Sequence, residues 1–558
     1  RTRLLSGNED VIYFNNSPYT LKKIVIRLYQ DFYKYGAARN FEINKETVSD
    51  GINLTQLKFN DENIDLTNSS ATNRGNALLI VRLSKPLLPS TSINISADWS
   101  FVIPKGSNVR MGTYDSSTFF IAYWYPQVAV YDDIDGWDVI GYNGEQEFYN
   151  DFNNFDVELT VPVSMGIWAT GLLQNPESVL QPEYLKRLRQ AKASDEVVNI
   201  ITKEDLQKTV YINSSDKNVW KFKAEHVPDF AFGTSDHYLW DASTLKLDDK
   251  NVLISAVYIE SSEDFYKVAG IARSAIEYFS TDLPGVPYPY PSMTVFNGAG
   301  GMEFPMIVNN GSASTENGTV HLTSHEICHT YFPFYMGVNE KKYAWMDEGW
   351  AVMIPFKFQA TNAVGYDPYA RYVKAYESIS GAELEMPMIT PSILLRSTAY
   401  RAASYNRPSI AYQILLETLG EEVFKTALKE YIQNWNGKHP VPFDFFNSFN
   451  KSTAQDLNWF WKPWFFEKGY PDLAIKKIDN GEGVVRVLVE KVGNIPVPVY
   501  LNIKTGEGEE ITVKRSASIW KDGASEVWVE HELPAPPQQI TIGSKYVPDV
   551  NNENNKLK

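Results

Sequence analysis

The chain has 558 residues, of which 43% are apolar and 14% aromatic, and it carries a formal net charge of −16. This acidic balance argues against a nucleic acid partner, which would need a basic surface. No apolar run approaches the ~18 residues that cross a bilayer, so we expect no transmembrane segment in this chain. The length predicts three or four domains.

Residues 1–232 have the pattern of a β-rich domain. Apolar and polar residues alternate from Ile93 to Phe101 and from Phe155 to Val161, and a period of two is typical of half-buried strands. The charged stretch 176–208 interrupts this pattern. Its composition predicts an inserted surface helix whose charges face solvent.

Residues 233–470 have a different period, which predicts a mainly helical domain. Apolar residues between Phe265 and Phe279 recur at helical spacing, whereas Met293–Phe296 is a short apolar run of the kind that forms a buried strand. Further helices are expected around 325–329, 368–379, 408–420, 421–435, 444–446 and 456–461.

The last part of the chain returns to a strand pattern. The breaker sequence Lys468–Pro471 predicts a boundary near residue 470, and the polar residues 551–558 predict a frayed tail. Short strands between them favour a small β-sandwich over 471–550, so the predicted fold class is multidomain α+β. The strands are expected at 485–489, 499–503, 527–529 and 540–542.

A glycine-rich segment follows the strand at 293–296, with the sequence Gly300-Gly301-Met302-Glu303-Phe304-Pro305. Glycines allow a backbone to approach a ligand closely, and an extended segment can pair with a peptide as an added strand. Glu303 would then offer a carboxylate to a cation such as a peptide's free α-amine. Taken alone, the segment is equally well a glycine-rich turn with a surface glutamate.

The most informative motif is His325-Glu326-Ile327-Cys328-His329. Two histidines four positions apart point to the same side of a helix, so both can reach one Zn²⁺. Glu326 lies ~100° round the helix, where it can take a proton from a water at the metal's open position. With 7 His and 68 acidic residues in the chain, chance predicts only roughly 0.01 such matches.

A catalytic zinc needs a third protein ligand, and Glu348 stands 19 positions after His329. The segment between them is long enough for the chain to turn and place a second helix against the first. Cys328, the only cysteine, would close the site as a fourth ligand, but a small buried helix residue is the simpler interpretation. The alternative to a zinc site is a buried helix with two hydrogen-bonded histidines.

These motifs together resemble the gluzincin zinc aminopeptidases, which include membrane alanyl aminopeptidase and the leukotriene-epoxide hydrolase. Trp220–Phe232 and Tyr123–Asp133 resemble further landmarks of that family. The resemblance implies a saddle-like β-rich domain over 1–232, a thermolysin-like catalytic domain over 233–470 and the β-sandwich over 471–550.

The resemblance also implies roles for individual residues. His325, His329 and Glu348 would bind one Zn²⁺ per chain, Glu326 would be the general base, and Glu303 would hold the substrate's N-terminal amine. Gly300, Gly301 and Met302 would line the substrate. Tyr405, which precedes an apolar helix, would stabilise the oxyanion, with Tyr400 as the alternative and a pocket residue.

Three positions depart from the family's usual sequence. Phe304 replaces an asparagine. The run Tyr405-Asn406-Arg407-Pro408 lacks the lysine and glycine of the family's Tyr-x-Lys-Gly-like run, and Asp347 replaces an asparagine before the third ligand. The first affects the expected side-chain pocket and the second the tyrosine assignment. The third adds negative charge near the metal.

The predicted function is a zinc-dependent aminopeptidase acting on peptides with a free N-terminus. The alternatives are an epoxide hydrolase or an endopeptidase on the same scaffold, and a non-catalytic zinc-binding scaffold. Relatives of this shape often carry export signals and the chain begins with Arg1 rather than Met. We therefore expect an exported protein, periplasmic, in the cell envelope or extracellular, with the cytoplasm as the alternative.

Overall fold

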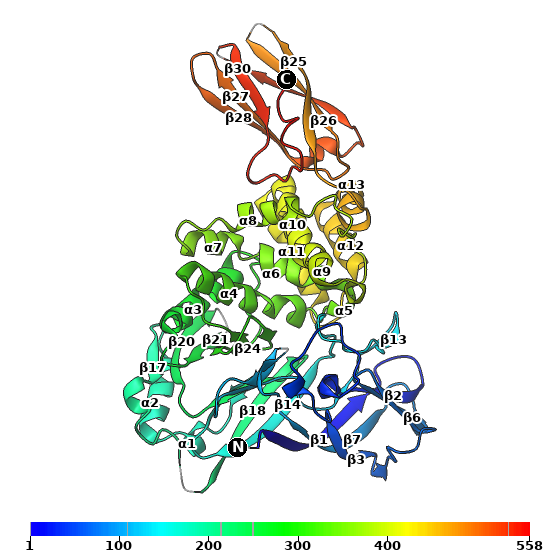
Figure 1. Ribbon diagram of the computed structural model, residues 1–558, viewed down its shortest axis with the longest axis vertical. Helices are drawn as coiled ribbons and strands as arrows, with labels where there is room; N and C mark the ends of the chain where they lie inside the picture. Colours follow the sequence, from blue (N-terminus) through cyan, green and yellow to red (C-terminus); the bar gives the residue numbers. More distant parts are fainter. Residues whose placement is uncertain are drawn as a thin grey trace. The chain divides into compact units, whose positions relative to one another are not determined.

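The computed structural model describes residues 2–108, 110–212, 215–247, 250–481, 483–533 and 535–557. Its contacts divide the chain into two compact units, both drawn in Figure 1. The first comprises Arg1–Glu277 and Pro287–Gly337, and the second comprises Tyr278–Val286 and Val338–Lys558. Among the described helices, none is long and apolar enough to cross a membrane. The boundaries expected near residues 232 and 470 stay predictions.

The first unit begins with β-sheets, as the alternating pattern predicts. The two alternating runs lie in β7 (Ser92–Val102) and β14 (Asn153–Pro162), so both predicted strands are confirmed. β7 belongs to the sheet β1-β7-β3-β4 and β14 to the sheet β14-β18-β16. The same unit also contains the sheets β11-β2-β6-β5, β15-β19-β10-β9-β8 and β12-β13. The other strands are β1 (Leu4–Phe14), β2 (Leu21–Arg27), β3 (Asn53–Phe59), β4 (Glu62–Asn63), β5 (Thr72–Gly75), β6 (Leu78–Leu87), β8 (Gly106–Asn108), β9 (Met111–Thr113), β10 (Phe119–Ile121), β11 (Gln127–Val128), β12 (Tyr131–Asp132), β13 (Gly136–Trp137), β15 (Gly166–Ala169), β16 (Leu172–Leu173), β18 (Lys217–Val227) and β19 (Phe232–Ser235).

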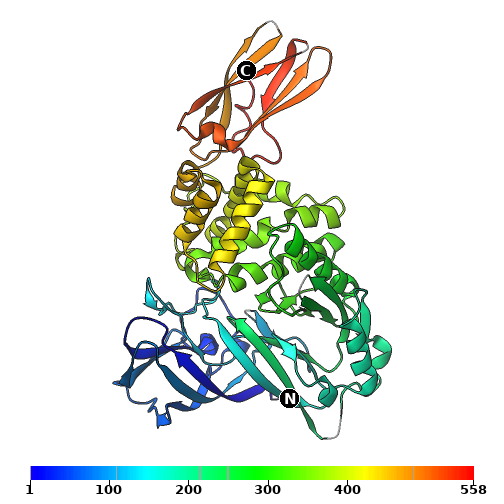
Figure 2. The same cartoon turned by 180° about the vertical axis from the view of Figure 1, so that it is seen from behind.

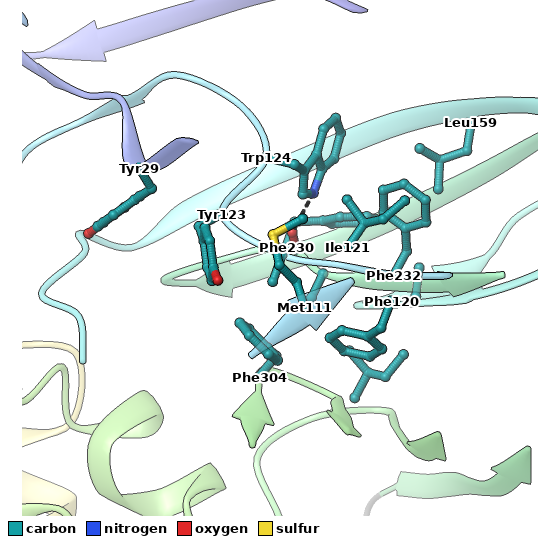
Figure 3. Close-up of a cluster of buried hydrophobic side chains, with 14 of the residues drawn as sticks. Tyr29, Met111, Phe120, Ile121, Tyr123, Trp124, Leu159, Phe230, Phe232 and Phe304 are labelled. Carbon is teal, nitrogen blue, oxygen red and sulfur yellow. Dashed lines mark hydrogen bonds between the residues drawn. The ribbon is translucent and has the colours of Figure 1, made fainter. Parts of the chain in front are cut away.

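An aromatic core lies among these strands (Figure 3). The Trp124 indole N–H donates to the Phe230 carbonyl at 2.8 Å, so the buried ring keeps its hydrogen bond. Phe120 packs against Phe304 with ring centroids 5.5 Å apart. The glycine-rich segment therefore contributes Phe304 to the core of the β-rich region.

The segment 176–208 contains the expected helix and also a strand. α1 (Pro176–Val179) and α2 (Pro182–Ala191) form the helical part, and α2 buries Tyr184 and Leu188. The chain then returns as β17 (Val198–Ile201), which pairs antiparallel with β20. The sequence interpretation, made from the charges, did not include this strand, whose apolar residues extend a sheet.

A six-stranded sheet of order β17-β20-β21-β22-β24-β23 carries Glu303 on its edge strand β23. β21, β22 and β24 run parallel, and β23 pairs antiparallel with β24 at the edge. The predicted strand at 293–296 is confirmed as β22, and the helix expected at 265–279 as α3. The elements are β20 (Leu239–Leu247), β21 (Lys250–Tyr258), α3 (Val268–Thr281), β22 (Ser292–Asn297), β23 (Glu303–Phe304), β24 (Ile307–Asn310) and α4 (Glu316–Cys328).

The second unit contains the remaining helices, and the predicted ones are confirmed as α8 and α10 to α13. Gly420 ends α10 in a positive-φ conformation of +82° that favours glycine. The helices are α5 (Glu340–Tyr343), α6 (Glu348–Met353), α7 (Phe356–Asn362), α8 (Pro368–Glu377), α9 (Ser397–Arg401), α10 (Arg407–Leu419), α11 (Glu421–Trp435), α12 (Pro442–Thr453) and α13 (Asn458–Trp461).

Two three-stranded antiparallel sheets end the second unit, in the orders β25-β26-β29 and β28-β27-β30. Seen from both sides in Figures 1 and 2, the two sheets lie next to each other. All four predicted strands are confirmed, and so is the α+β fold class with β-rich, helical and β parts in that order. The strands are β25 (Leu473–Asn480), β26 (Val484–Lys491), β27 (Val499–Thr505), β28 (Glu510–Arg515), β29 (Glu526–Glu532) and β30 (Pro537–Ile542).

Candidate metal and substrate site

The two histidines of the motif lie on one side of α4. Thr315 caps the helix by accepting from the Gly318 amide at 3.1 Å. The helix ends at Cys328, and His329 keeps a helical conformation as the capping residue (φ −57°, ψ −14°). The Nε2 atoms of His325 and His329 are consequently only 3.3 Å apart, as spacing by four residues predicts.

The turn after the helix orients His329. Residues Thr330–Tyr335 form a wide turn whose Phe332 has non-helical dihedrals, so the Phe332 carbonyl lies 3.0 Å from Nδ1 of His329. A carbonyl can only accept, so Nδ1 carries the proton and Nε2 presents its lone pair. This is the tautomer that a metal ligand requires, fixed by a backbone partner.

The geometry of this pair fits a tetrahedral zinc ion. Two nitrogens bound at ~2.0–2.1 Å around a tetrahedral centre are about 3.3 Å apart, which is the separation found here. His325, His329 and Glu348 together form a candidate metal-binding group among the described residues. Two imidazoles and a carboxylate are a donor set of the catalytic zinc type.

Glu326 is buried beside the glycine-rich segment. A β-carbon on Gly301 would lie 2.3 Å from Oε1 of Glu326, so a side chain there would force the carboxylate to shift. Carboxylate oxygens of Glu326 and Glu303 and a ring nitrogen of His329 lie within 4.8 Å of one another. Glycine at position 301 thus lets the backbone approach the carboxylate, and the two sequence motifs meet at this contact.

Glu303 lies on the edge strand β23 and is only 3% exposed. Gly300, with φ +92°, turns the chain into this strand, and the Met302 carbonyl accepts from the Asn309 amide at 2.7 Å. Neighbouring residues of a strand point to opposite faces, so Phe304 enters the aromatic core while Glu303 lies on the side of His329, 3.8 Å from its Nδ1.

A second buried carboxylate, Glu147, lies near Glu303 and was missed by the sequence interpretation. Ligand oxygens of the two side chains are within 4.8 Å of each other. Arg110 contacts Glu147 at 3.1 Å and so neutralises one of the two charges. Residues 141–149 contain neither helix nor strand, and no pattern in the sequence distinguishes this glutamate from its neighbours.

The second unit contributes Glu348, the first residue of α6. Its helix is fixed by close packing on α10: Trp350 stacks on Tyr412 with ring centroids 3.6 Å apart, and a β-carbon on Gly349 would lie 2.7 Å from Pro408. α6 therefore depends on α10 for its position. Glu348 itself is 2% exposed.

Tyr405 stands in the turn that leads into α10, and its hydroxyl donates to Oε1 of Glu348. Tyr400 is more deeply buried, and its ring centroid lies 6.2 Å from that of Tyr405. Of the two tyrosines considered from the sequence, Tyr405 thus contacts the predicted third ligand directly.

The unusual sequence after Tyr405 has a structural reason. Arg407 is fully buried and pairs with buried Glu385 at 3.0 Å, and its other terminal nitrogen donates to the carbonyls of Pro463 and Glu467, both at 2.8 Å. Arg407 satisfies its charge through these partners. The pair anchors the start of α10 directly after Tyr405, and the sequence interpretation did not find it.

Two histidines on one side of a helix, a glutamate beside them and a second glutamate nineteen positions on form a candidate site of the kind that zinc metallopeptidases use. Residues 287–464 match the description "Peptidase family M1 domain". This part of the chain is similar to the peptidase M1 family, and proteins named aminopeptidases are its distant relatives.

The curated relatives are similar over less than half of this chain. Aminopeptidase 2 of Candida albicans is 22% identical over 43% of this chain and 29% of its own length. Aminopeptidase N of Lactococcus lactis is 23% identical over 45% of this chain and 32% of its own length. The match thus spans about a third of these relatives' length.

Solved structures share the fold over more of the chain. An M1 zinc metallopeptidase from Deinococcus radiodurans is 14% identical with a TM-score of 0.55, covering 83% of this chain and 90% of that one. Aminopeptidase A of Legionella pneumophila, in complex with aspartic acid, is 12% identical with a TM-score of 0.64, covering 95% and 55%. At this identity the likeness establishes the fold alone.

Proposed function

We propose that this protein is a zinc-dependent aminopeptidase that removes N-terminal residues from peptides. The observation that carries the proposal is the pair of Nε2 atoms 3.3 Å apart on α4, in a candidate metal-binding group with Glu348. We propose one Zn²⁺ per chain at these three ligands. The match of residues 287–464 to the peptidase M1 domain supports a metallopeptidase reaction at these three residues.

The chain's own residues have distinct roles in the proposed reaction. A zinc ion held there supplies Lewis acidity toward water and a carbonyl oxygen. Glu326, which is no ligand of the proposed ion, accepts the proton of the attacking water and passes it to the leaving amine. Tyr405 donates a hydrogen bond to the carbonyl oxygen as negative charge develops there.

The amine end of the substrate is the reason for proposing an exopeptidase. Glu303 is buried, and Glu147 nearby is partly neutralised by Arg110. A buried carboxylate gains most from a cation, and the α-ammonium of a peptide is one. Edge strand β23 offers a backbone on which the peptide can lie. The Legionella relative, solved with an amino acid bound, is consistent with this substrate class.

The test is a panel of fluorogenic aminoacyl substrates, assayed with the zinc-loaded protein, with a chelator, and after zinc is restored. We expect cleavage that the chelator abolishes and zinc restores. An epoxide substrate and an internally quenched peptide with a blocked N-terminus belong in the same panel. Zinc-dependent turnover of the epoxide without aminoacyl cleavage would identify an epoxide hydrolase, and turnover of the blocked peptide alone would identify an endopeptidase. Zinc binding without turnover of any substrate would identify a non-catalytic scaffold.

A further inference from the structure

The loop 298–302, between β22 and Glu303, is packed so tightly that its first residue has no room for a side chain. A β-carbon on Gly298 would lie 1.7 Å from Oδ1 of Asn309 and 2.7 Å from the ring of Tyr114. Further along, the Gly300 carbonyl accepts from the amide of Gly311, the residue after β24, at 2.5 Å, and the Met302 carbonyl accepts from the amide of Asn309 in β24 at 2.7 Å. The loop is thus held at several points before the chain reaches Glu303.

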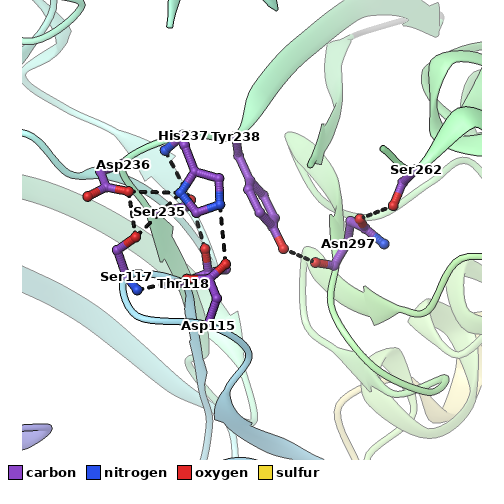
Figure 4. A network of polar contacts seen from close by, with 9 residues as sticks. All are labelled: Asp115, Ser117, Thr118, Ser235, Asp236, His237, Tyr238, Ser262 and Asn297. Carbon is purple, nitrogen blue, oxygen red and sulfur yellow. Dashed lines mark hydrogen bonds and ion pairs between the residues drawn. The ribbon is translucent and has the colours of Figure 1, made fainter. Parts of the chain in front are cut away.

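Tyr238 holds the beginning of this loop (Figure 4). Its hydroxyl donates to the carbonyl of Asn297, the last residue of β22, at 2.7 Å. Ser262 donates to the side-chain oxygen of the same asparagine at 2.7 Å. The loop therefore leaves the sheet from a residue whose main chain and side chain are both fixed.

The ring of Tyr238 is itself fixed. It stacks on Phe296 with ring centroids 5.2 Å apart. The preceding His237 lies between two carboxylates, 3.2 Å from Asp115 and 2.8 Å from Asp236. Figure 4 shows this network joining the turn before β10 to the turn before β20. None of these residues belongs to the proposed metal ligands or to the proposed acid–base groups.

We propose that Tyr238 is a positioning residue for substrate recognition: its bond to Asn297 fixes the loop 298–302 and so places the Glu303 carboxylate for the substrate's ammonium group. The expected effect on KM rests on the proposed aminopeptidase function. An ammonium pair is present in both the bound substrate and the transition state, so displacement of Glu303 raises KM more than it lowers kcat.

The experiment compares Tyr238→Phe with Tyr288→Phe, a matched control at the other end of the same strand. Tyr288 is also buried, and its hydroxyl donates to the carbonyl of Ser292, the first residue of β22, at 3.1 Å. Each variant loses one hydroxyl–carbonyl bond at one end of β22 and a side-chain bond to one threonine, Thr118 for Tyr238 and Thr330 for Tyr288. Their thermal stabilities should therefore fall by similar amounts. Only Tyr238→Phe changes the end that carries the loop.

We expect Tyr238→Phe to raise KM about tenfold for a substrate with a free amine, the equivalent of one lost hydrogen bond, with kcat within about twofold and zinc content unchanged. Tyr288→Phe should keep the wild-type KM. Hydrogen exchange followed by mass spectrometry, on peptides covering 298–303, should be faster in Tyr238→Phe than in both the control and the wild type.

Kinetics and hydrogen exchange test the positioning role of Tyr238 separately from the proposed aminopeptidase function. If the wild-type protein cleaves free and N-acetylated substrates equally, the proposed aminopeptidase function fails, and hydrogen exchange still decides the positioning of the loop. If the wild type prefers free amines but both variants show the same KM and the same exchange over 298–303, the positioning role of Tyr238 is wrong.

Discussion

At the scale of single residues, the contact between Gly301 and Glu326 is the most sensitive point of the site. A methyl group on Gly301 would meet the carboxylate at 2.3 Å, so Gly301→Ala must displace the proposed base. We expect kcat to fall by about 10²-fold with zinc content unchanged. Gly270→Ala is the matched control, because a β-carbon there meets nothing within 4 Å. Equal kcat values in the two variants would contradict the proposed role of Glu326.

We expect opposite effects on catalysis from substitutions of Tyr405 and Tyr400. Tyr405 donates to Glu348, which places its hydroxyl beside the proposed ligand set, so Tyr405→Phe should lower kcat by ~10²–10³-fold with a small change in KM. Tyr400→Phe should keep kcat within a few-fold. Steady-state kinetics of both variants at full zinc loading decides the matter, and the reverse order of effects would make Tyr400 the oxyanion donor.

A buried carboxyl in the β-rich region should make the stability of the fold depend on pH. Asp229 accepts from Tyr125, Gln127 and the Phe230 amide, but burial outweighs these bonds and raises the pKa of its side chain to about 7. In the unfolded chain this pKa is ~3.9. Between these values the folded state keeps a proton that the unfolded state loses, so folded-state stability decreases as pH rises from ~4 to ~7.

Replacing Asp229 by asparagine removes that ionisation while keeping an oxygen for the same donors. We expect Asp229→Asn to flatten the pH dependence by an amount on the order of a few kcal/mol across this window. Chemical denaturation of both proteins at pH 4.5 and pH 7.5 measures it. An unchanged difference between the two pH values would show that Asp229 is ionised in the folded protein.

At the scale of elements, Phe304 shows how a strand with two residues serves both core and site. Its ring packs on Phe120 in the aromatic core, while Glu303 lies on the opposite face. Phe304→Asn, which installs the residue usual at this position in the similar family, should therefore destabilise the fold by about 3–5 kcal/mol, as removal of a buried phenylalanine does. A denaturation midpoint equal to that of the wild type would contradict this.

Sequence periodicity predicted the helices and strands whose apolar residues lie on one face. β7 and β14 alternate strictly, α11 has a long apolar stripe, and helical spacing placed His325 and His329 on one side. Contacts between segments distant in sequence were not predictable, because no local pattern reports them. Glu147 lies in a segment without regular structure, and Arg407 pairs with Glu385 through tertiary packing. β17 was missed because charges around it dominated the interpretation of 176–208.

At the scale of the whole molecule, binding of the proposed zinc ion should stabilise the folded protein. A metal that binds only the folded protein stabilises it by mass action, by about 2.7 kcal/mol at a hundredfold excess over Kd. We expect zinc to raise the Tm of the wild type and to raise that of Glu348→Ala much less. Equal shifts in a thermal scan would exclude Glu348 from the ligand set.

We propose above all that Glu303 gives this protein its aminopeptidase specificity. The most direct test is kcat/KM for a peptide with a free amine and for its N-acetylated form, in wild type and Glu303→Ala. A broken buried charge pair costs ~2–5 kcal/mol, so the wild type should prefer the free peptide by at least tens of times. Glu303→Ala should lose most of this preference through the free peptide alone. Equal losses on both substrates would contradict the account.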